Sequence, residues 1–501
     1  MPLRFNCVLA LAIFAITPLY SDDLTGEQKI RAALAALPDP NDKQALSLWN
    51  SLGTIHQSQG KLSEAETDYR RALALSPSKT IEASLLNNLA TVKQAQRDFA
   101  TADSLLKLGS EILKETNSLE TKAAGPLLAN LALNFQQRGK LIDAERAYRE
   151  AESVFQHTLN TVTADFVLFL SNFGLLNFEI GHYKEGITRE RRALEIQAKL
   201  DNVTNSQKAY LLNNLGLGLA EVGEVTEANA LFLRAVELER NSAPASGRHL
   251  IETLSNLAAL EEKSGRYEQA HQHETEAENA ARTAFRDTEP TWATIWNNLG
   301  IIAMMQRNYR EAQRQFNKAA AQWLNTVGPE SPLYAVTLSN MSGLESQRGR
   351  HKQAEQCASA ALEIDLAHYG PNHPRVAADL ALLAGETFHR KKMDESIDLL
   401  LRAKAMYEKF PGSNPLAVGR VLNDLAIAYL KSGKFKESKD YYEQAVRMYE
   451  SQQASHLPQY ATCLHQYATL LRSLGDFANA EQIEVRATHA DVQTALATGL
   501  R

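Results

Sequence analysis

One pattern recurs eleven times along the chain of 501 residues, and this repetition constrains the fold more than any other feature. The stretch LLNNLGLGLAEVGEVTEANALFLRAVELE (211–239) shows the pattern around its turn residue, Gly223. After a first step of 37 residues, the turn residues follow one another at steps of 42: Gly60, Arg97, Gly139, Gly181, Gly223, Gly265, Arg307, Gly349, Lys391, Gly433 and Gly475. A fixed period of about 20–50 residues is typical of solenoids, in which stacked units bury a continuous core.

Each copy of the pattern has the spacing of two amphipathic helices joined by a tight turn. Leucine-like residues lie eleven and eight positions before the turn residue, and small residues lie seven before, five after and twelve after; around Gly223 these are Leu212, Leu215, Gly216, Ala228 and Ala235. The leucines form a buried stripe, and the small residues allow the two helices to approach closely. Glycine at the turn favours a left-handed cap, so the turns at Arg97, Arg307 and Lys391 are expected to be slightly strained.

This arrangement resembles the tetratricopeptide repeat over residues 43–490, nearly the whole chain. The 42-residue repeat is longer than the usual form of that family, and the additional residues follow the second helix, as in GPNHPRVAADL (370–380). This longer form is similar to the repeats of kinesin light chain and their bacterial relatives. Gly328 and Gly370 are expected to end second helices, and Pro290, Pro332, Pro374 and Pro458 to begin first helices. The resemblance implies an all-α, right-handed superhelical solenoid of about eleven helix–turn–helix repeats that binds proteins and is not an enzyme.

The first 21 residues have the composition of a signal peptide. An apolar run, CVLALAIFAITPLY, follows Arg4 and ends at the acidic start SDD. The run is shorter than the roughly 20 residues of a transmembrane helix. It predicts export to the periplasm or the medium with cleavage near Ser21, after which no membrane insertion is expected; the alternative is an uncleaved inner-membrane anchor. Residues 22–42 are expected to form a capping helix and loop, and residues 491–501 a C-terminal cap or tail.

An asparagine stands nine residues before the turn in seven successive copies: Asn88, Asn130, Asn172, Asn214, Asn256, Asn298 and Asn340. Helical spacing places this row on the side of the first helix that faces away from its partner, which in a tetratricopeptide array lines the concave surface. Asparagine is a poor helix former, but its amide both donates and accepts hydrogen bonds. The row therefore predicts a groove for an extended or helical peptide segment. The alternative is that each amide bonds to a neighbouring helix and fixes the stacking.

Apolar and amide residues beside the row indicate the character of such a ligand. Leu133, Leu175, Leu217 and Tyr210 would add apolar surface to the groove, unless they only pack between repeats, and Asn213 and Asn297 would add amides. No Lys or Arg stands at the asparagine position or one before it, so a clamp for a C-terminal carboxylate is disfavoured.

Other functions have little support in the sequence. The net charge is −6 and no basic run is present, which argues against nucleic-acid binding. His271 and His273 stand two apart on a predicted helix and point in different directions, so they do not form a metal pair. Cys357 and Cys463 fall in different repeats, too far apart for a disulfide.

The sequence thus predicts neither a cofactor, a metal nor a catalytic site, and it predicts a protein or peptide partner. Self-association through the ends of the solenoid, or a place as the non-catalytic subunit of an envelope enzyme or secretion complex, stays open.

Overall fold

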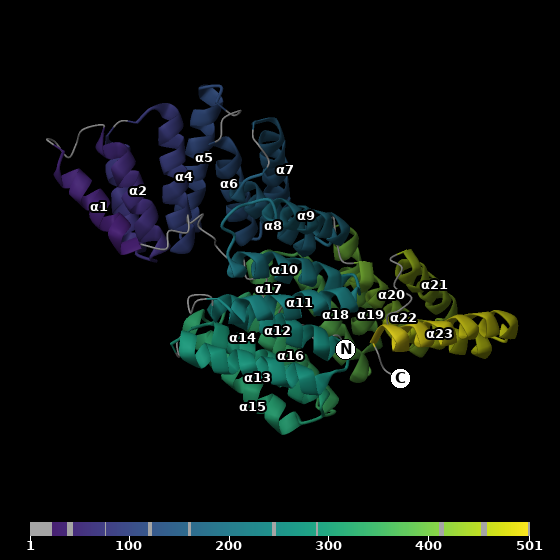
Figure 1. The fold of residues 1–501 in the computed structure, drawn as a ribbon. Coiled ribbons are helices and arrows are strands. Elements are labelled where there is room, and N and C mark those ends of the chain that lie inside the picture. Colours follow the sequence, from purple (N-terminus) through teal and green to yellow (C-terminus); the bar gives the residue numbers. More distant parts are fainter. Residues whose placement is uncertain are drawn as a thin grey trace. The chain divides into compact units, whose positions relative to one another are not determined.

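A computed structural model describes residues 23–37, 44–75, 77–118, 123–158, 162–242, 247–286, 289–409, 415–451 and 458–498. These residues form 23 α-helices (Figure 1). The signal-peptide and membrane-anchor predictions concern residues outside this part of the chain. The helices are α1 (Asp23–Ala35), α2 (Ala45–Ser58), α3 (Leu62–Ala74), α4 (Lys79–Ala95), α5 (Phe99–Glu115), α6 (Ala124–Gln137), α7 (Leu141–Thr158), α8 (Ala164–Glu179), α9 (Tyr183–Gln197), α10 (Asn205–Glu221), α11 (Val225–Arg240), α12 (Gly247–Lys263), α13 (Tyr267–Ala284), α14 (Thr291–Met305), α15 (Tyr309–Thr326), α16 (Pro332–Gln347), α17 (His351–Tyr369), α18 (Pro374–His389), α19 (Met393–Lys409), α20 (Pro415–Lys431), α21 (Phe435–Ser451), α22 (Pro458–Ser473) and α23 (Phe477–Thr498).

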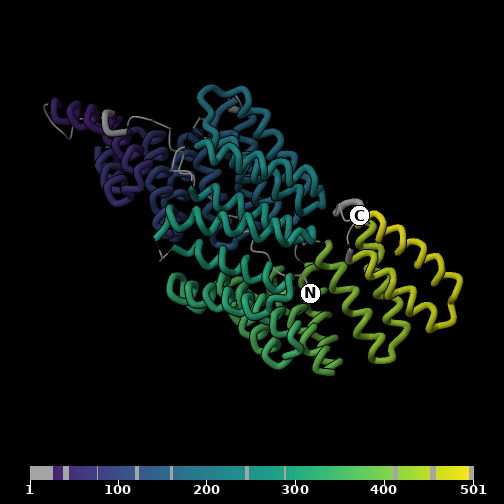
Figure 2. The backbone as a smooth tube through the Cα atoms, turned by 60° about the horizontal axis from the view of Figure 1, so that its bottom comes forward, coloured from purple at the N-terminus to yellow at the C-terminus, as the bar shows by residue number. Residues whose placement is uncertain are grey.

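After the single helix α1, the helices form eleven consecutive pairs, from α2–α3 to α22–α23. Each pair is one repeat of the sequence, and repeats 1 to 11 are numbered here in chain order, so that repeat 6 turns at Gly265 and repeat 7 at Arg307. Paired helices pack side by side, as α10 does with α11 and α12 with α13, and Figure 2 traces the backbone through them. The prediction of an all-α array of about eleven helix–turn–helix repeats is confirmed.

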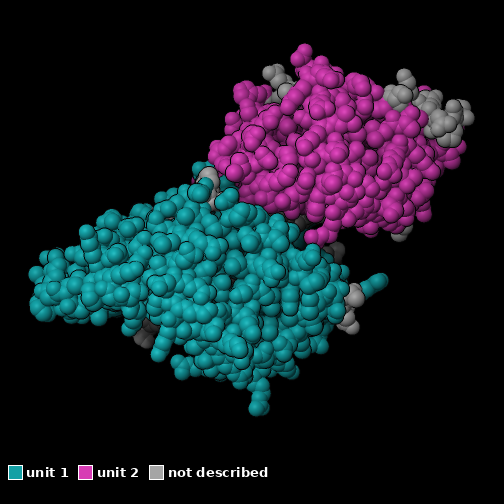
Figure 3. Space-filling model, turned by 180° about the vertical axis from the view of Figure 1, so that it is seen from behind, with its two compact units in different colours: residues 1–9, 178–187, 204–501 teal, residues 10–177, 188–203 magenta. Residues whose placement is uncertain are grey.

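The chain divides into two compact units, which Figure 3 shows in two colours. Unit 2 contains α1 to α7, α8 up to Asn177, and Thr188–Val203. Unit 1 contains Phe178–Ile187 and the chain from Thr204 onwards, with α10 to α23. The features described below each lie within one unit.

The turns between paired helices have the left-handed backbone that the sequence predicts. The turn glycines have φ between 70° and 85°. Arg97, Arg307 and Lys391 adopt the same conformation, with φ of 62°, 61° and 62°. Because a Cβ atom makes this region costly, these three turns carry strain that glycine would relieve.

The connections between successive repeats also have the helix ends that the sequence predicts. Gly328 and Gly370 have φ of 84° and 77°, and Gly370 is the C-cap of α17. Helices α16 and α18 begin at Pro332 and Pro374. Pro290 lies one residue before the start of α14, at its N-cap.

The small residue seven before the turn makes room for a ring. A Cβ atom on Gly216 would lie 2.8 Å from the Phe232 ring, and one on Gly300 would lie 2.6 Å from the Phe316 ring. Both rings are fully buried and lie nine residues after their turns. The predicted close approach of paired helices is therefore a slot in the first helix that a side chain of the second helix fills.

Candidate functional site

The asparagines nine before the turn connect neighbouring repeats in four places. In each case the Nδ2 atom donates to the Oδ1 atom of an asparagine that stands ten before the turn in the preceding repeat. We call this contact an amide junction. The four are Asn88 with Asn50 (3.0 Å), Asn130 with Asn87 (2.9 Å), Asn256 with Asn213 (2.9 Å) and Asn340 with Asn297 (3.1 Å). Stacking, the alternative use considered for the row, thus has direct geometric support at these positions.

The row differs in exposure between the two units. In unit 1, Asn214, Asn256, Asn298 and Asn340 are buried, with exposed fractions of 3%, 7%, 1% and 1%. In unit 2, Asn88, Asn130 and Asn172 are only half-buried. Contact with a partner therefore stays a prediction for the row, and the half-buried members in unit 2 offer more surface for it.

The apolar neighbours of the row lie inside the array. Leu133, Leu175, Leu217 and Tyr210 are each less than a tenth exposed. This corrects the expectation that they form an open apolar strip beside the amides. These side chains pack between helices, as their spacing equally allowed.

Asn172 is the exception among the half-buried asparagines. The residue ten before the turn in the preceding repeat is Ala129, which has no side-chain acceptor. Among the described residues, the Asn172 amide makes no side-chain hydrogen bond. Because an amide that stays partly exposed can exchange water for a ligand at little cost, Asn172 has unused hydrogen-bonding capacity.

Two repeats use a buried acid where others use a ring. In repeat 6, Glu274 on α13 takes the position that Phe232 and Phe316 occupy in repeats 5 and 7. Its Oε1 atom accepts from the Ser255 hydroxyl (3.0 Å) and from the Asn298 amide of repeat 7 (3.3 Å). We call this contact the acid junction. In repeat 4, Glu190 is likewise buried and accepts from the Ser171 hydroxyl at 2.9 Å.

Burial perturbs both acids in the same direction. Desolvation raises the pKa of Glu274 to about 8, against hydrogen bonds from Ser255 and Asn298 that favour the ionised form. Desolvation also raises the pKa of Glu190 well above its ordinary value. A carboxyl buried without a cation nearby stays protonated because its charge would lose hydration.

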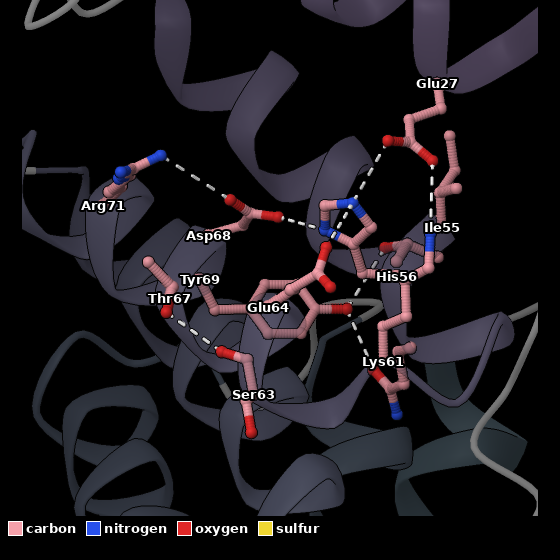
Figure 4. A network of polar contacts seen from close by, with 12 residues as sticks. Glu27, Ile55, His56, Lys61, Ser63, Glu64, Thr67, Asp68, Tyr69 and Arg71 are labelled. Carbon is pink, nitrogen blue, oxygen red and sulfur yellow. Dashed lines mark hydrogen bonds and ion pairs between the residues drawn. The ribbon is translucent and has the colours of Figure 1, made fainter.

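A second polar network attaches the N-terminal helix to repeat 1 (Figure 4). His56 is buried, and its Nδ1 atom lies 2.6 Å from Asp68 Oδ2, while Nε2 lies 3.5 Å from Glu27 Oε1 on α1. The hydrogen bond from Arg31, with help from the Lys61 charge, lowers the pKa of Glu27 to about 2. A buried His–Asp pair resembles part of a catalytic site, but here, with Glu27, it joins α1 to α2 and α3.

The remaining candidates from the sequence have ordinary structural partners. His271 Nδ1 lies 2.9 Å from the Thr275 hydroxyl, and His273 Nδ1 lies 2.7 Å from Glu261. Cys357 and Cys463 are free thiols. Within the described ranges, no group of His, Cys, Asp and Glu side chains has a metal-binding arrangement. None of the described helices combines the length and apolar content of a membrane span.

Sequence reasoning noticed the row but missed its acceptors. Asn213 and Asn297, ten before the turn, were expected to add amides to the groove, and their role as acceptors for the next repeat was not predicted, although Asn87, Asn213 and Asn297 alternate there with serines. Glu190 and Glu274, nine after the turn at a position that aromatic or leucine residues occupy in seven other repeats, were a second signal. Reading both positions together would have predicted the two kinds of junction.

Comparisons with known proteins agree with the repeat. Sequence profiles described as tetratricopeptide repeat match residues 44–115, 293–367 and 377–451, and a second profile of that description matches residues 423–491. Together they cover more than half of the chain. With the paired helices and the left-handed turns, this shows that the chain belongs to the tetratricopeptide repeat family. No curated protein sequence matches it.

Solved structures similar to this chain match it at low sequence identity. A Rap protein complexed with competence and sporulation factor is 14% identical, covers 74% of this chain and 99% of its own, and has a TM-score of 0.53. BtubC (BKLC) from P. vanneervenii is 22% identical over 45% of this chain and 91% of its own, with a TM-score of 0.40. The nearly identical TPR-like repeats attributed to a kinesin light chain of Podosopora anserina are 18% identical over 41% of this chain and 97% of their own, with a TM-score of 0.36.

Proposed function

We propose that the protein is a non-enzymatic scaffold that binds an extended or helical segment of a partner protein along the asparagine row of unit 2. Tetratricopeptide arrays commonly present a first-helix face to a peptide, and the Rap protein among the structural neighbours is complexed with competence and sporulation factor. The observation that carries the proposal is Asn172, a half-buried amide that lacks a side-chain partner among the described residues. Asn88 and Asn130 extend the same half-buried row.

Two substitutions test this site in opposite ways. Asn172→Ala removes the amide. Ala129→Asn keeps the amide and supplies the acceptor that Asn87 supplies to Asn130, so Asn172 becomes engaged in an amide junction. If Asn172 holds a partner backbone, both variants weaken binding, although only one of them lacks the amide.

The measurement is the affinity of the purified protein for peptides selected from a phage-displayed random library on the unchanged protein. Asn340→Ala, at a buried amide junction in unit 1, serves as the control variant. We expect a roughly fivefold or greater loss of affinity for Asn172→Ala and Ala129→Asn, since one hydrogen bond contributes about 1 kcal/mol. Unchanged affinity in both variants, with helical content retained, would refute the site.

Self-association is the second candidate, and one observation favours it. Helix α23, the last of the described helices, exposes Phe477, Val485 and Val492, with exposed fractions of 70%, 65% and 53%. Exposed apolar side chains favour contact with another molecule. Light scattering of the purified protein at increasing concentration is expected to show oligomers that Phe477→Ser abolishes; a monomer at every concentration would exclude this role.

We infer from residues 1–21 that the protein is exported and cleaved near Ser21, with an uncleaved inner-membrane anchor as the alternative. The support is the apolar run bounded by Arg4 and an acidic start. N-terminal sequencing of the protein from its native cells is expected to begin at or just after Ser21. A sequence that begins at Met1 or Pro2 would contradict cleavage.

A further inference from the structure

The acid junction differs from its neighbours in having a group that can gain a charge. The junctions on either side, between repeats 5 and 6 and between repeats 7 and 8, are amide junctions. In repeats 5 and 7, the paired helices enclose the Phe232 and Phe316 rings. Only the junction between repeats 6 and 7, among these three, has an ionisable side chain at its centre.

Glu274 is placed where its ionised form is costly, because it is buried and, within the described part of the chain, only one of its two oxygens accepts hydrogen bonds. The side chain is 0% exposed, and its Oε2 atom accepts no hydrogen bond from any described residue. Oε1 already accepts from both Ser255 and Asn298. A buried carboxylate needs more donors or a cation, because desolvation of an unpaired charge is costly.

The surrounding helices bring no cation to the carboxyl. Helix α14 contains no ionisable residue at all. Helix α12 contains, from end to end, Arg248, His249, Glu252, Glu261, Glu262 and Lys263. Of these groups and those on α13, the one whose charge acts on Glu274 is Glu278, which is also acidic and further disfavours ionisation. Glu278 accepts from Arg282 and from the Trp296 indole.

Asn298 can accept the proton of the neutral acid once its amide is turned. As placed, its Nδ2 atom donates to Glu274, and its Oδ1 atom is buried without a hydrogen-bond partner among the described residues. Rotation of the amide by half a turn exchanges donor and acceptor, so that Oδ1 accepts the proton of the neutral acid. The proton on Glu274 then bridges repeat 6 to repeat 7.

We propose that Glu274 is a proton-operated latch between repeats 6 and 7: its neutral carboxyl holds Asn298 of repeat 7, and loss of the proton loosens this junction while the amide junctions on either side stay closed. The raised pKa puts the change in the neutral to mildly alkaline range. The proposal does not rest on the proposed function, because the junction can be observed without a partner.

Two variants of Glu274 separate the latch from ordinary packing. Glu274→Gln has the same shape and cannot ionise. Glu274→Leu copies repeats 2 and 9, where Leu106 and Leu400 are buried nine after the turn and alanine, as in repeat 6, stands seven before it. Glu252→Gln on α12 is the control, because burial raises the pKa of Glu252 to about 7 as well.

The first readout is the melting temperature of each protein at pH 6 and at pH 9. A group protonated in the folded state and ionised in the unfolded state makes stability fall as pH rises. We expect Glu274→Gln to raise the melting temperature, relative to the unchanged protein, by at least about 3 °C more at pH 9 than at pH 6. An equal difference at the two pH values would overturn the latch.

The second readout is local. Hydrogen exchange, corrected for its intrinsic pH dependence, is followed in α14 and, for comparison, in α10 and α16. In the unchanged protein we expect protection in α14 to fall between pH 6 and pH 9 by several-fold more than in the other two helices. Glu274→Gln and Glu274→Leu should both abolish this extra loss, whereas Glu252→Gln should keep it. A loss that is uniform across the three helices, or that persists in Glu274→Gln, would overturn the proposal.

Discussion

The junctions between repeats 5 and 6 and between repeats 6 and 7 join similar helices by different chemistry. At the first, the Asn256 amide donates to Asn213 and the Phe232 ring fills the slot at Gly216. At the second, Ser255 and Asn298 both donate to Glu274, which stands where the ring would be. From one repeat to the next, an amide contact that does not depend on pH is thus replaced by a carboxyl contact whose strength depends on the protonation of Glu274. The difference teaches that stacking in this array can be tuned locally without altering the backbone.

The largest expected effect concerns the ring of an amide junction. Phe316→Ala should lower the free energy of unfolding by about 3–5 kcal/mol at any pH between 5 and 9, because it empties a fully buried slot. Chemical denaturation measures the loss. The pair Gly300→Ala with Phe316→Leu copies Ala384 and Leu400 of repeat 9 and should recover at least half of the stability. A loss that varies strongly with pH would remove the contrast with the acid junction.

The second effect concerns the acid and depends on pH. Its folded pKa of about 8 lies above the ordinary value of 4.5, so the stability it contributes is complete below about pH 4.5 and is lost as pH rises to about 8. The full loss is at most about 5 kcal/mol. Glu274→Leu should therefore unfold at nearly the same denaturant concentration at pH 8.5 and at pH 6. The pH effect of Glu252, another acid with a raised pKa, is measured with Glu252→Gln and subtracted. If the variant and the unchanged protein follow parallel pH curves, Glu274 is not the sensitive group.

The third effect compares two asparagines of the row. Asn256→Ala leaves the buried Asn213 oxygen without its donor and should cost about 1–3 kcal/mol. Asn172→Ala removes an amide that lacks a side-chain partner among the described residues, and should cost under about 0.5 kcal/mol. Denaturant midpoints distinguish the two. Equal costs would mean that the amide junctions contribute nothing particular to stability.

The smallest effect concerns the turns. Arg307→Gly should stabilise the protein by about 1 kcal/mol, because its φ of 61° is unfavourable for a residue with a Cβ atom. Gly265→Ala, at a φ of 74° in repeat 6, should destabilise it by a similar amount. A calorimetric scan of each variant checks the two signs, and a stabilising Gly265→Ala would show that the turns are not strained.

The sequence predicted the array well because its signals are local. The 42-residue period, the turn residues and the alternation of helices depend on neighbouring positions within one repeat, and the structure confirms them. The row of asparagines was also visible, but its use was not, since donation by Asn256 to Asn213 depends on how two repeats stack. Whether Leu133, Leu175 and Leu217 border a groove or pack between repeats was left open by the sequence for the same reason: the face they occupy is open in an isolated helix and closed in the array.

The sequence shows that residue 274 is a glutamate, but taken alone it does not predict that this glutamate is buried. A glutamate on an amphipathic second helix is ordinarily solvated, and only comparison with Phe232 and Phe316 shows that the position is buried. The Asn172 amide shows the converse case. It lacks a side-chain acceptor because Ala129 stands at the acceptor position of the preceding repeat. Taken alone, Ala129 predicts nothing about Asn172.

A double-mutant cycle on Asn213 and Asn256 tests most directly the claim that the asparagine row joins the repeats of unit 1. The free energy of unfolding is measured for Asn213→Ala, Asn256→Ala, the double variant and the unchanged protein. The predicted result is a coupling energy of about 0.5–3 kcal/mol, because Asn256→Ala leaves the Asn213 oxygen without its donor and Asn213→Ala leaves the Asn256 nitrogen without its acceptor in a buried site. Losses that add to within about 0.3 kcal/mol would contradict the account, since residues that do not interact behave in that way.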